Sequence, residues 1–303
     1  MVPESSRGFA LGAAAYTMWG LFPLYWPLLE PAGAVEILAH RVAWSLVTML
    51  ALVVLVRRSR SMRALLADRR TRWILTGAAV VIAVNWGTYI WGVNNEHVVE
   101  TSLGYFINPL VTVLMGVVVL SERLRPLQWA ALGIAAVAVI GLTVEYGRPP
   151  WVALTLAFSF GLYGLAKKKA GAGAVESLTY ETVVLTPIAL GYIGYLVWTG
   201  SAEFGSNGSG HVVLMILTGV VTAIPLICFG AAATRVSLTT IGLLQYLAPT
   251  IQFALGVLLF REPMPTMRWV GFGLVWVALV IFTVEAVNHR RRQLRLAAEA
   301  SAL

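Results

Sequence analysis

The sequence predicts an all-α membrane protein in which ten transmembrane helices form two inverted five-helix repeats around a central cavity. The first observation is composition: the chain is 58% hydrophobic and only 12% charged, whereas soluble domains average roughly 45–50% and 25%. The second is an internal repeat, because residues 103–145 recur 140 positions later as residues 243–285 without insertion or deletion. The third is the odd number of crossings in each copy, which makes the second copy enter the membrane from the opposite face.

The repeat includes residue types that apolar composition does not explain. The matched pairs are Pro109 with Pro249, Gly116 with Gly256, Glu122 with Glu262, Trp129 with Trp269, and Gly133 with Gly273. Upstream, the tetrapeptide Gly-Ala-Val-Glu at residues 33–36 returns at residues 173–176. Two copies of about 140 residues are too few and too long for a solenoid or a propeller. The chain therefore divides into a first repeat (1–146), a second repeat (147–289) and a basic cytoplasmic tail (290–303).

Each repeat is expected to contain five membrane-crossing helices. Apolar windows of about 20 residues, the length that crosses the hydrocarbon core, begin near Gly8, Ala34, Thr71, Thr101, Pro126, Pro150, Val175, His211, Thr239 and Met267. The first window, residues 8–27, is too long for the apolar region of a signal peptide, so we expect a retained helix. The longest charged connection between windows spans residues 57–72.

Charge indicates the orientation of the chain. The connections on the side of the chain ends carry most of the 22 Lys and Arg residues, which predicts that both termini are cytoplasmic. The formal net charge of +8 is explained by this topology. The basic residues do not form a stripe interleaved with aromatic residues, so they do not indicate a nucleic-acid-binding protein. The single cysteine, Cys228, cannot form a disulfide framework or a cysteine metal site.

Inverted repeats are the usual architecture of secondary transporters, which bind their solute near the bilayer midplane where the halves meet. The sequence has no phosphate-binding loop of the form G-x-x-x-x-G-K-[ST] and no ligand spacing for zinc. We therefore expect no cofactor and no metal, and a gradient as the energy source, with a proton as the candidate coupling ion. The expected partners are the lipid bilayer and a small-molecule substrate.

Two ionisable residues lie within the second expected helix, where polar groups are costly. They are His40 and Arg41, which the 140-residue offset pairs with Tyr180 and Glu181. We expect Arg41 and Glu181 to meet between the halves, with Arg41 contacting an anionic or zwitterionic solute and Glu181 or His40 responding to protons. The alternatives are an interhelical ion pair that holds the halves together, or snorkelling of these side chains at helix ends.

The third expected helix contributes a polar and aromatic face. Asn85 and Tyr89 are one helical turn apart and Trp86 lies beside them. Rings for stacking and an amide for hydrogen bonding suit an amphipathic organic solute. The alternative is a belt of polar and aromatic residues at the membrane interface.

Further candidates surround helix-interior prolines or recur in the second half. They are Tyr105 and Asn108 before Pro109, Gln245 and Gln252 around Pro249, and Tyr163 in the sixth helix. Proline frees a backbone carbonyl, which is tolerated where the helix lines a cavity or contacts another helix, so a packing kink is the alternative. Glu122 and Glu262, in the charged turns, are expected to cap helices or pair locally.

Three stretches resemble a known family. Residues 36–45 (EILAHRVAWS), 85–95 (NWGTYIWGVNN) and 102–109 (SLGYFINP) are similar to RarD proteins, a branch of the EamA-type transporters in the drug/metabolite transporter superfamily. The resemblance implies a bacterial inner-membrane protein that exports or exchanges small organic solutes. It also implies that the first four helices of each repeat surround the cavity and the fifth packs outside.

Three functions compete. The first is a secondary transporter (permease or exporter) that moves small amphipathic solutes by alternating access, with a buried cation and aromatic walls that favour carboxylate-bearing molecules such as amino acids. The second is a receptor or assembly subunit that does not transport, whose signature is a sealed core around Arg41. The third is a membrane-embedded enzyme acting on lipids, for which Glu36, His40 and Glu181 are the inward candidates. We expect the protein not to be an enzyme.

Overall fold

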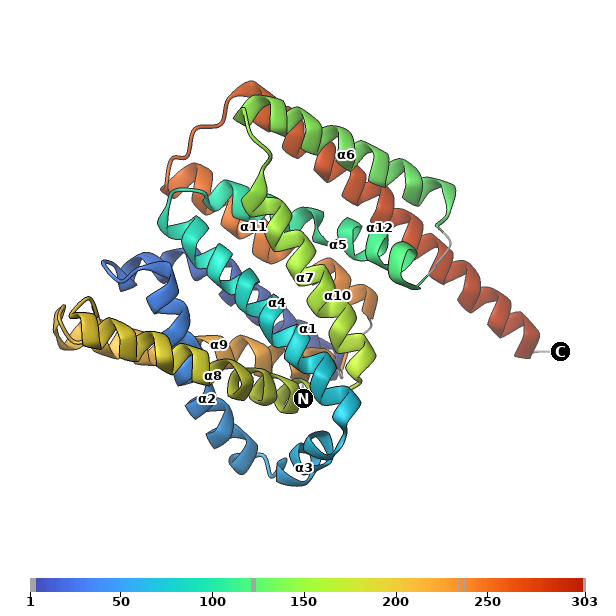
Figure 1. Ribbon diagram of the computed structural model, residues 1–303. Helices are drawn as coiled ribbons and strands as arrows, with labels where there is room; N and C mark the ends of the chain where they lie inside the picture. Colours follow the sequence, from blue (N-terminus) through green and yellow to red (C-terminus); the bar gives the residue numbers. More distant parts are fainter. Residues whose placement is uncertain (1–3, 121–123, 234, 237, 302–303) are drawn as a thin grey trace.

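The computed structural model describes residues 4–120, 124–233, 235–236 and 238–301 (Figure 1), and within them all regular structure is helical. The first half contains α1 (Glu4–Gly20), η1 (Phe22–Leu24), η2 (Trp26–Leu29), α2 (Ala34–Leu55), α3 (Ser59–Ala67), α4 (Arg69–Asn94), α5 (Val98–Leu120) and α6 (Pro126–Tyr146). The second half contains α7 (Trp151–Ala170), α8 (Ala174–Thr199), α9 (Gly208–Ala233), α10 (Leu238–Leu244), α11 (Leu247–Ala254), η3 (Leu255–Leu259) and α12 (Thr266–Ser301).

Eight helical segments of the described chain are long and apolar enough to cross a membrane, and Trp151–Lys167 of α7 is a shorter apolar helix. The protein is therefore a multi-pass membrane protein. The charged turn that contains Glu122 lies outside the described residues. At the other end of the chain, the segment predicted as a tail from residue 290 continues α12 as helix to Ser301.

The first expected span is shorter than predicted. We expected one helix over residues 8–27, whereas α1 ends at Gly20 and the 3-10 helices η1 and η2 follow. Pro23 and Pro27, which open these two helices, lack an N–H donor and clash with the preceding turn of an α-helix. The break has a consequence for the core, because Trp26 of η2 is completely buried in a cluster with Tyr89 and Ile90 of α4.

The ninth expected helix is also broken. It consists of α10, α11 and the π-helical turn η3, and the break between α10 and α11 falls at Gln245 and Tyr246. A proline ring clashes with the carbonyl group four residues before it, and Pro249 stands four residues after Gln245. The helix is therefore broken one turn before Pro249, whereas α5 runs unbroken through the equivalent Pro109.

The helices pack in pairs that the 140-residue offset exchanges. The packing of α4 and α5 on α7 corresponds to the packing of α9 and α11 on α1, and the packing of α2 on α9 corresponds to that of α8 on α4. In three further pairs the offset maps each helix onto its own packing partner. These pairs are α2 with α8, α5 with α11, and α6 with α12. Helices α6 and α12 lie side by side along one edge of the molecule (Figure 1), with α5 as their next neighbour.

Ion pairs between helix ends give the direction of the self-corresponding pairs. Arg125 at the start of α6 bonds Glu285 of α12 at 2.6 Å, and Arg268 at the start of α12 bonds Glu145 at the end of α6 at 2.8 Å. Because each start meets the other end, α6 and α12 are antiparallel.

Helices α2 and α8 are antiparallel for the same reason. Glu36 in the first turn of α2 accepts hydrogen bonds from the backbone of Glu203 and Phe204, just after the end of α8. Arg58, just after the end of α2, pairs with Glu176 in the first turn of α8. This direction decides which predicted site residues can meet.

Candidate functional site

Arg41 stands two turns into α2 and is buried, with 4% of its surface exposed. Its Nε donates a hydrogen bond to Thr222 Oγ1 of α9 at 3.0 Å. The guanidinium carbon lies 4.1 Å from the ring centre of Trp86 and 5.0 Å from that of Trp26. Rings at these distances attract a cation through their negative faces. Arg41 is therefore held in an aromatic cage built from η2, α2 and α4, with α9 closing it.

The cage leaves the hydrogen-bonding capacity of Arg41 largely unused. A guanidinium carries five N–H donors, and only the one on Nε has an acceptor among the described residues. No carboxylate of the described chain lies within 4.0 Å of this side chain. A buried charge without a counter-ion costs several kcal/mol. The site therefore offers a positive charge and free donors to an anion.

Several other buried polar groups also lack partners in the described part of the chain. Among the described residues, neither ring nitrogen of His40, the hydroxyl of Tyr89, nor Oε1 of Gln252 has a hydrogen-bond partner. Gln252 donates its other amide atom to the carbonyl oxygen of Trp19 at 3.1 Å. Tyr89 and Phe22 belong to the same buried cluster as Trp26. Such unsatisfied polar atoms in an apolar core are rare, and each requires an explanation.

Asn85 is held in place by α7. Its amide nitrogen donates to the carbonyl oxygen of Leu156 at 3.1 Å and to Ser159 Oγ at 2.9 Å, and its carbonyl oxygen accepts from Tyr105 at 3.3 Å. The ring of Tyr105 packs edge-on against Tyr89, with 5.6 Å between centroids. Asn85 thus fixes Tyr105, and Tyr105 supports Tyr89.

Glu181 has different partners from the one predicted. Its carboxylate accepts from Lys167 Nζ at 2.8 Å and from the hydroxyl of Tyr163 at 3.0 Å, both on α7. The expectation that Arg41 and Glu181 meet is wrong. Each lies near the start of its own helix, and in the antiparallel pair α2–α8 the two starts are at opposite ends, roughly 20 Å apart along the axis at 1.5 Å per residue.

A row of aromatic rings connects the two ends. From Tyr89 the contact continues to Tyr105, then to Phe160 with 6.1 Å between centroids, and then to Tyr163 with 6.1 Å. Tyr163 bonds Glu181. Three predicted aromatic candidates, Tyr89, Tyr105 and Tyr163, are therefore linked by successive ring contacts through Phe160.

The remaining candidates lie outside these groups. The hydroxyl of Tyr180 lies 3.2 Å from Thr76 Oγ1. Asn108 Oδ1 is buried without a partner in the described chain and faces Gly161. Gln245 lies at the break between α10 and α11 and joins neither group through a side-chain hydrogen bond found among the described residues.

Three residues of the site escaped sequence analysis. Trp26 was placed in a lipid-crossing window, Thr222 was a lone hydroxyl in an apolar run, and Lys167 was counted only as a topological charge. The prolines at positions 23 and 27 were the available signal for Trp26, since they break the helix. No signal short of the tertiary packing indicated Thr222.

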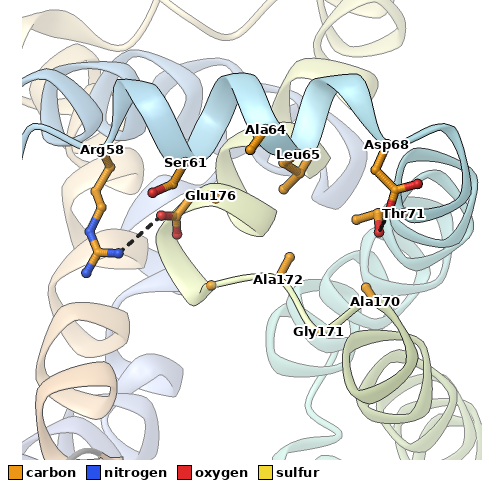
Figure 2. A pocket seen from close by; sticks show the side chains of 11 residues that line it. Arg58, Ser61, Ala64, Leu65, Asp68, Thr71, Ala170, Gly171, Ala172 and Glu176 are labelled. Carbon is orange, nitrogen blue, oxygen red and sulfur yellow. Dashed lines mark hydrogen bonds and ion pairs between the residues drawn. The ribbon is translucent and has the colours of Figure 1, made fainter.

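Two cavities lie at the ends of the bundle. One of about 360 Å³ lies between α3 and the turn from α7 to α8 (Figure 2), and one of about 370 Å³ is lined by His97, Glu100, Glu262 and their neighbours. Arg41 lines neither of these two cavities. No cluster of three metal-ligating side chains occurs in the described ranges.

Glu262 beside the second cavity caps α5, as expected for this turn. It accepts from the backbone N–H groups of Val98 at 2.5 Å and Val99 at 2.9 Å. Burial raises the pKa of Glu262 to about 7, outweighing the two N–H donors that lower it.

Membrane transporters combine a multi-pass helical bundle with ionisable residues in its core. The sequence profile of the EamA-like transporter family matches residues 6–144 and again residues 149–284. The chain belongs to this family and, within it, to the RarD proteins.

Individual relatives match over nearly the whole chain. Protein RarD of Streptomyces exfoliatus is 57% identical over 289 residues, covering 95% of this chain and 92% of the relative. A Bacillus subtilis (strain 168) protein named Uncharacterized transporter YojE is 43% identical over 292 residues, covering 95% and 97%. A solved crystal structure that is 16% identical shares the fold, with a TM-score of 0.59 over 93% of this chain and 98% of that one.

Proposed function

We propose that this protein is a secondary transporter of the bacterial inner membrane that moves small amphipathic organic solutes by alternating access between two inverted five-helix repeats. Arg41 carries the proposal, because a buried cation with free N–H donors and no carboxylate within 4.0 Å among the described residues is costly unless a ligand uses it. The family match and the names of the relatives support transport.

The proposed topology has ten crossings. The spans found by length and hydropathy are completed by α7 and α1, and both termini face the cytoplasm because most Lys and Arg residues lie on that side. The inverted relation is supported by helix contacts that exchange under the 140-residue offset and by the two ion pairs that join α6 and α12 start to end. A pseudo-two-fold axis in the membrane plane generates such pairs.

The proposed solute carries a carboxylate on an apolar or aromatic body. A carboxylate matches the fork of guanidinium donors in bidentate geometry, and the rings of Trp86 and Tyr89 supply faces for an apolar group. Amino acids with large side chains fit this description. A proton is the proposed coupling ion, with His40 and Glu181 as the groups that would bind it.

A receptor or assembly subunit without transport is the second candidate. It is favoured by one observation, the 4% exposure of Arg41, which a permanently sealed core would also give. Water at this depth decides between the two. In a Cys228→Ser background, a cysteine at position 105 that reacts with a soluble maleimide indicates an opening core, and complete protection under all conditions indicates the receptor.

Membrane-enzyme chemistry is not proposed for the carboxylates. Glu36 is occupied by two backbone N–H groups, and Glu181 by Lys167 and Tyr163. Neither stands free beside the other as paired acid and base would require.

Counterflow in proteoliposomes tests the proposal. Vesicles loaded with unlabelled phenylalanine are diluted into labelled phenylalanine, with and without a pH gradient, and the assay is repeated for other amino acids and aromatic carboxylates. We expect saturable counterflow that Arg41→Gln reduces at least about 30-fold, since the loss of a charged hydrogen-bond pair costs about 2–5 kcal/mol. Equal counterflow by the wild type and by Arg41→Gln would remove Arg41 from the site, and no counterflow for any of these solutes would contradict the proposal.

A further inference from the structure

The repeated tetrapeptide Gly-Ala-Val-Glu places two glutamates that the proposed solute site does not use. Glu36 lies in the first turn of α2 and Glu176 in the first turn of α8, and both are buried, with 4% and 5% of their surface exposed. Since α2 and α8 are antiparallel, the two carboxylates occupy opposite ends of this helix pair, above and below the core. They are equivalent in sequence, and their surroundings can therefore be compared directly.

At the Glu36 end, hydrogen bonds hold the connection between α8 and α9 against α2. Oε1 of Glu36 accepts the backbone N–H groups of Glu203 at 2.9 Å and Phe204 at 3.1 Å, in the connection from α8 to α9. The ring of Phe204 stacks on His40 with 4.5 Å between centroids and 22° between planes. Hydrogen bonds to a carboxylate are roughly twice as strong as neutral ones. The connection therefore closes over the side of the bundle that holds His40 and Arg41.

A second link at this end joins the same two halves. His211 Nε2 at the start of α9 lies 2.9 Å from the carbonyl oxygen of Leu29 in η2. The hydroxyl of Tyr25 donates to the carbonyl oxygen of Leu214 at 2.5 Å. At the Glu36 end, α9 is therefore bonded to residues 25–29 of the first half, and the α8–α9 connection is bonded to α2.

At the Glu176 end, no backbone contacts equivalent to those of Glu36 are found among the described residues. Glu176 pairs there with Arg58 alone, at 3.4 Å, and 58% of the Arg58 side chain is exposed. The connection equivalent to residues 203–204 is α3, and no backbone N–H of the described part of α3 bonds Glu176. The cavity of about 360 Å³ lies between α3 and the turn from α7 to α8, and Figure 2 shows the side chains that line it. Tyr180, the equivalent of His40, bonds Thr76 of α4 instead of packing on the connection.

We propose that Glu36 and Glu176 are paired gate residues, each of which holds the opposite half's connection when its own end of the transporter is closed. This inference rests on the proposed alternating access. In this structure the Glu36 gate is engaged through two backbone N–H donors, whereas the Glu176 gate holds only the exposed side chain of Arg58 among the described residues. In the proposed orientation the transporter is closed toward the outside and loosened toward the cytoplasm. When the halves exchange conformations, the α8–α9 connection leaves Glu36 and α3 closes onto Glu176.

Opposite shifts in accessibility test the pair. Ser45→Cys in a Cys228→Ser background is the reporter, because Ser45 is buried on α2 one turn beyond Arg41 and shares its face. Right-side-out vesicles are treated with a membrane-impermeant maleimide, which enters only from outside. Glu36→Ala should raise the labelling rate at least about tenfold, because it removes two charged hydrogen bonds of the outward-closed state. Glu176→Ala should lower it at least about threefold, because the exposed pair with Arg58 is weak and the variant mainly loses the contacts of the opposite state.

Comparison of the Glu36→Ala and Glu176→Ala variants shows which outcome would contradict the gate proposal. Labelling that is unchanged in both variants, or that moves in the same direction in both, overturns the proposal, since a purely structural role has no reason to reverse sign. If Glu36→Ala does not reach the membrane folded, Phe204→Leu replaces it, because this variant keeps the N–H donor but removes the stack on His40. It should also raise labelling, and no increase contradicts the gate.

Counterflow of phenylalanine in the same wild-type vesicles separates the two proposals. Counterflow together with unshifted labelling rejects the gates and retains transport. Opposite labelling shifts without counterflow of any tested solute retain the gates and reject the solute assignment.

Discussion

Arg41 and Glu181 hold equivalent positions in the two repeats, yet Arg41 stacks on Trp86 at 4.1 Å without a described carboxylate partner, whereas Glu181 bonds Lys167 at 2.8 Å. The antiparallel packing of α2 and α8 puts the two charges at opposite ends. One end of the core therefore holds a cation that lacks an anion, and the other holds a satisfied pair. This difference separates a charge that is available to a solute from a charge whose partners lie within the protein.

Buried Arg41 and half-buried Lys167 should respond differently to removal of charge. Lys167→Met leaves Glu181 buried without its cation, and we expect it to destabilise the protein by about 3 kcal/mol. Arg41→Met removes a charge that has no counter-ion among the described residues, and the lost ring and Thr222 contacts of about 1–2 kcal/mol are offset by the relieved burial cost. We expect its stability to stay within about 1 kcal/mol of the wild type. Thermal unfolding of purified protein in detergent measures both, and an equal loss in both variants would contradict the distinction.

Close approach of α2 and α9 should depend on Gly219. A Cβ atom added there would meet the backbone of Trp44, so Gly219→Ala forces the helices apart at a cost of about 1–3 kcal/mol. Gly133→Ala is the matched control, because a Cβ atom there meets nothing within 4 Å. In α6 this change should be neutral or stabilising by about 0.5–1 kcal/mol. Similar melting temperatures for the two variants would show that the α2–α9 contact tolerates a wider spacing.

Stability should fall as pH rises through the range in which Glu262 titrates. Burial raises the pKa of Glu262 from 4.5 to about 7, so the folded state binds more protons than the unfolded state between these values. Its contribution is fully present below pH 4.5 and is lost as pH rises through about 7. After allowance for the partial exposure of the carboxyl, we expect an effect on the order of 1–2 kcal/mol.

The Glu262→Gln variant should flatten this pH dependence, because the amide does not titrate but keeps one acceptor for the start of α5. Melting temperatures of both proteins at pH 5 and pH 8 give the comparison. A wild type that becomes more stable toward pH 8 in this comparison would reverse the predicted sign.

The ion pairs that join α6 and α12 should show coupling in a charge swap. Arg268→Glu places a second carboxylate beside Glu145 and should destabilise the protein by about 2 kcal/mol. The double variant Arg268→Glu, Glu145→Arg should recover at least half of this loss. The pair is 18% and 13% exposed, whereas Arg125 of the second pair is 34% exposed. The same swap at Arg125 and Glu285 should therefore show a weaker coupling. Additive effects at Arg268 and Glu145 would mean that the ion pair contributes nothing.

The broad architecture followed from local sequence features. Apolar windows predicted helix starts that agree with the structure within a few residues, because a helix that crosses lipid must satisfy its own backbone hydrogen bonds over a fixed length. The matched residues of the repeat, such as Pro109 with Pro249, indicated two related halves. Prolines 23 and 27 carried the information that the first helix ends early, although the apolar window alone concealed it.

The sequence by itself determined a helical, multi-pass, internally duplicated chain with charged residues at costly depths, because length, hydropathy and repetition are properties of the chain alone. Only the tertiary structure decided the partners of those charges. Whether Arg41 meets Glu181 depends on the direction and register in which α2 packs on α8, and the aromatic cage depends on η2 folding back to bring Trp26 to α2. Contacts between segments distant in sequence are set by packing, which no local pattern records.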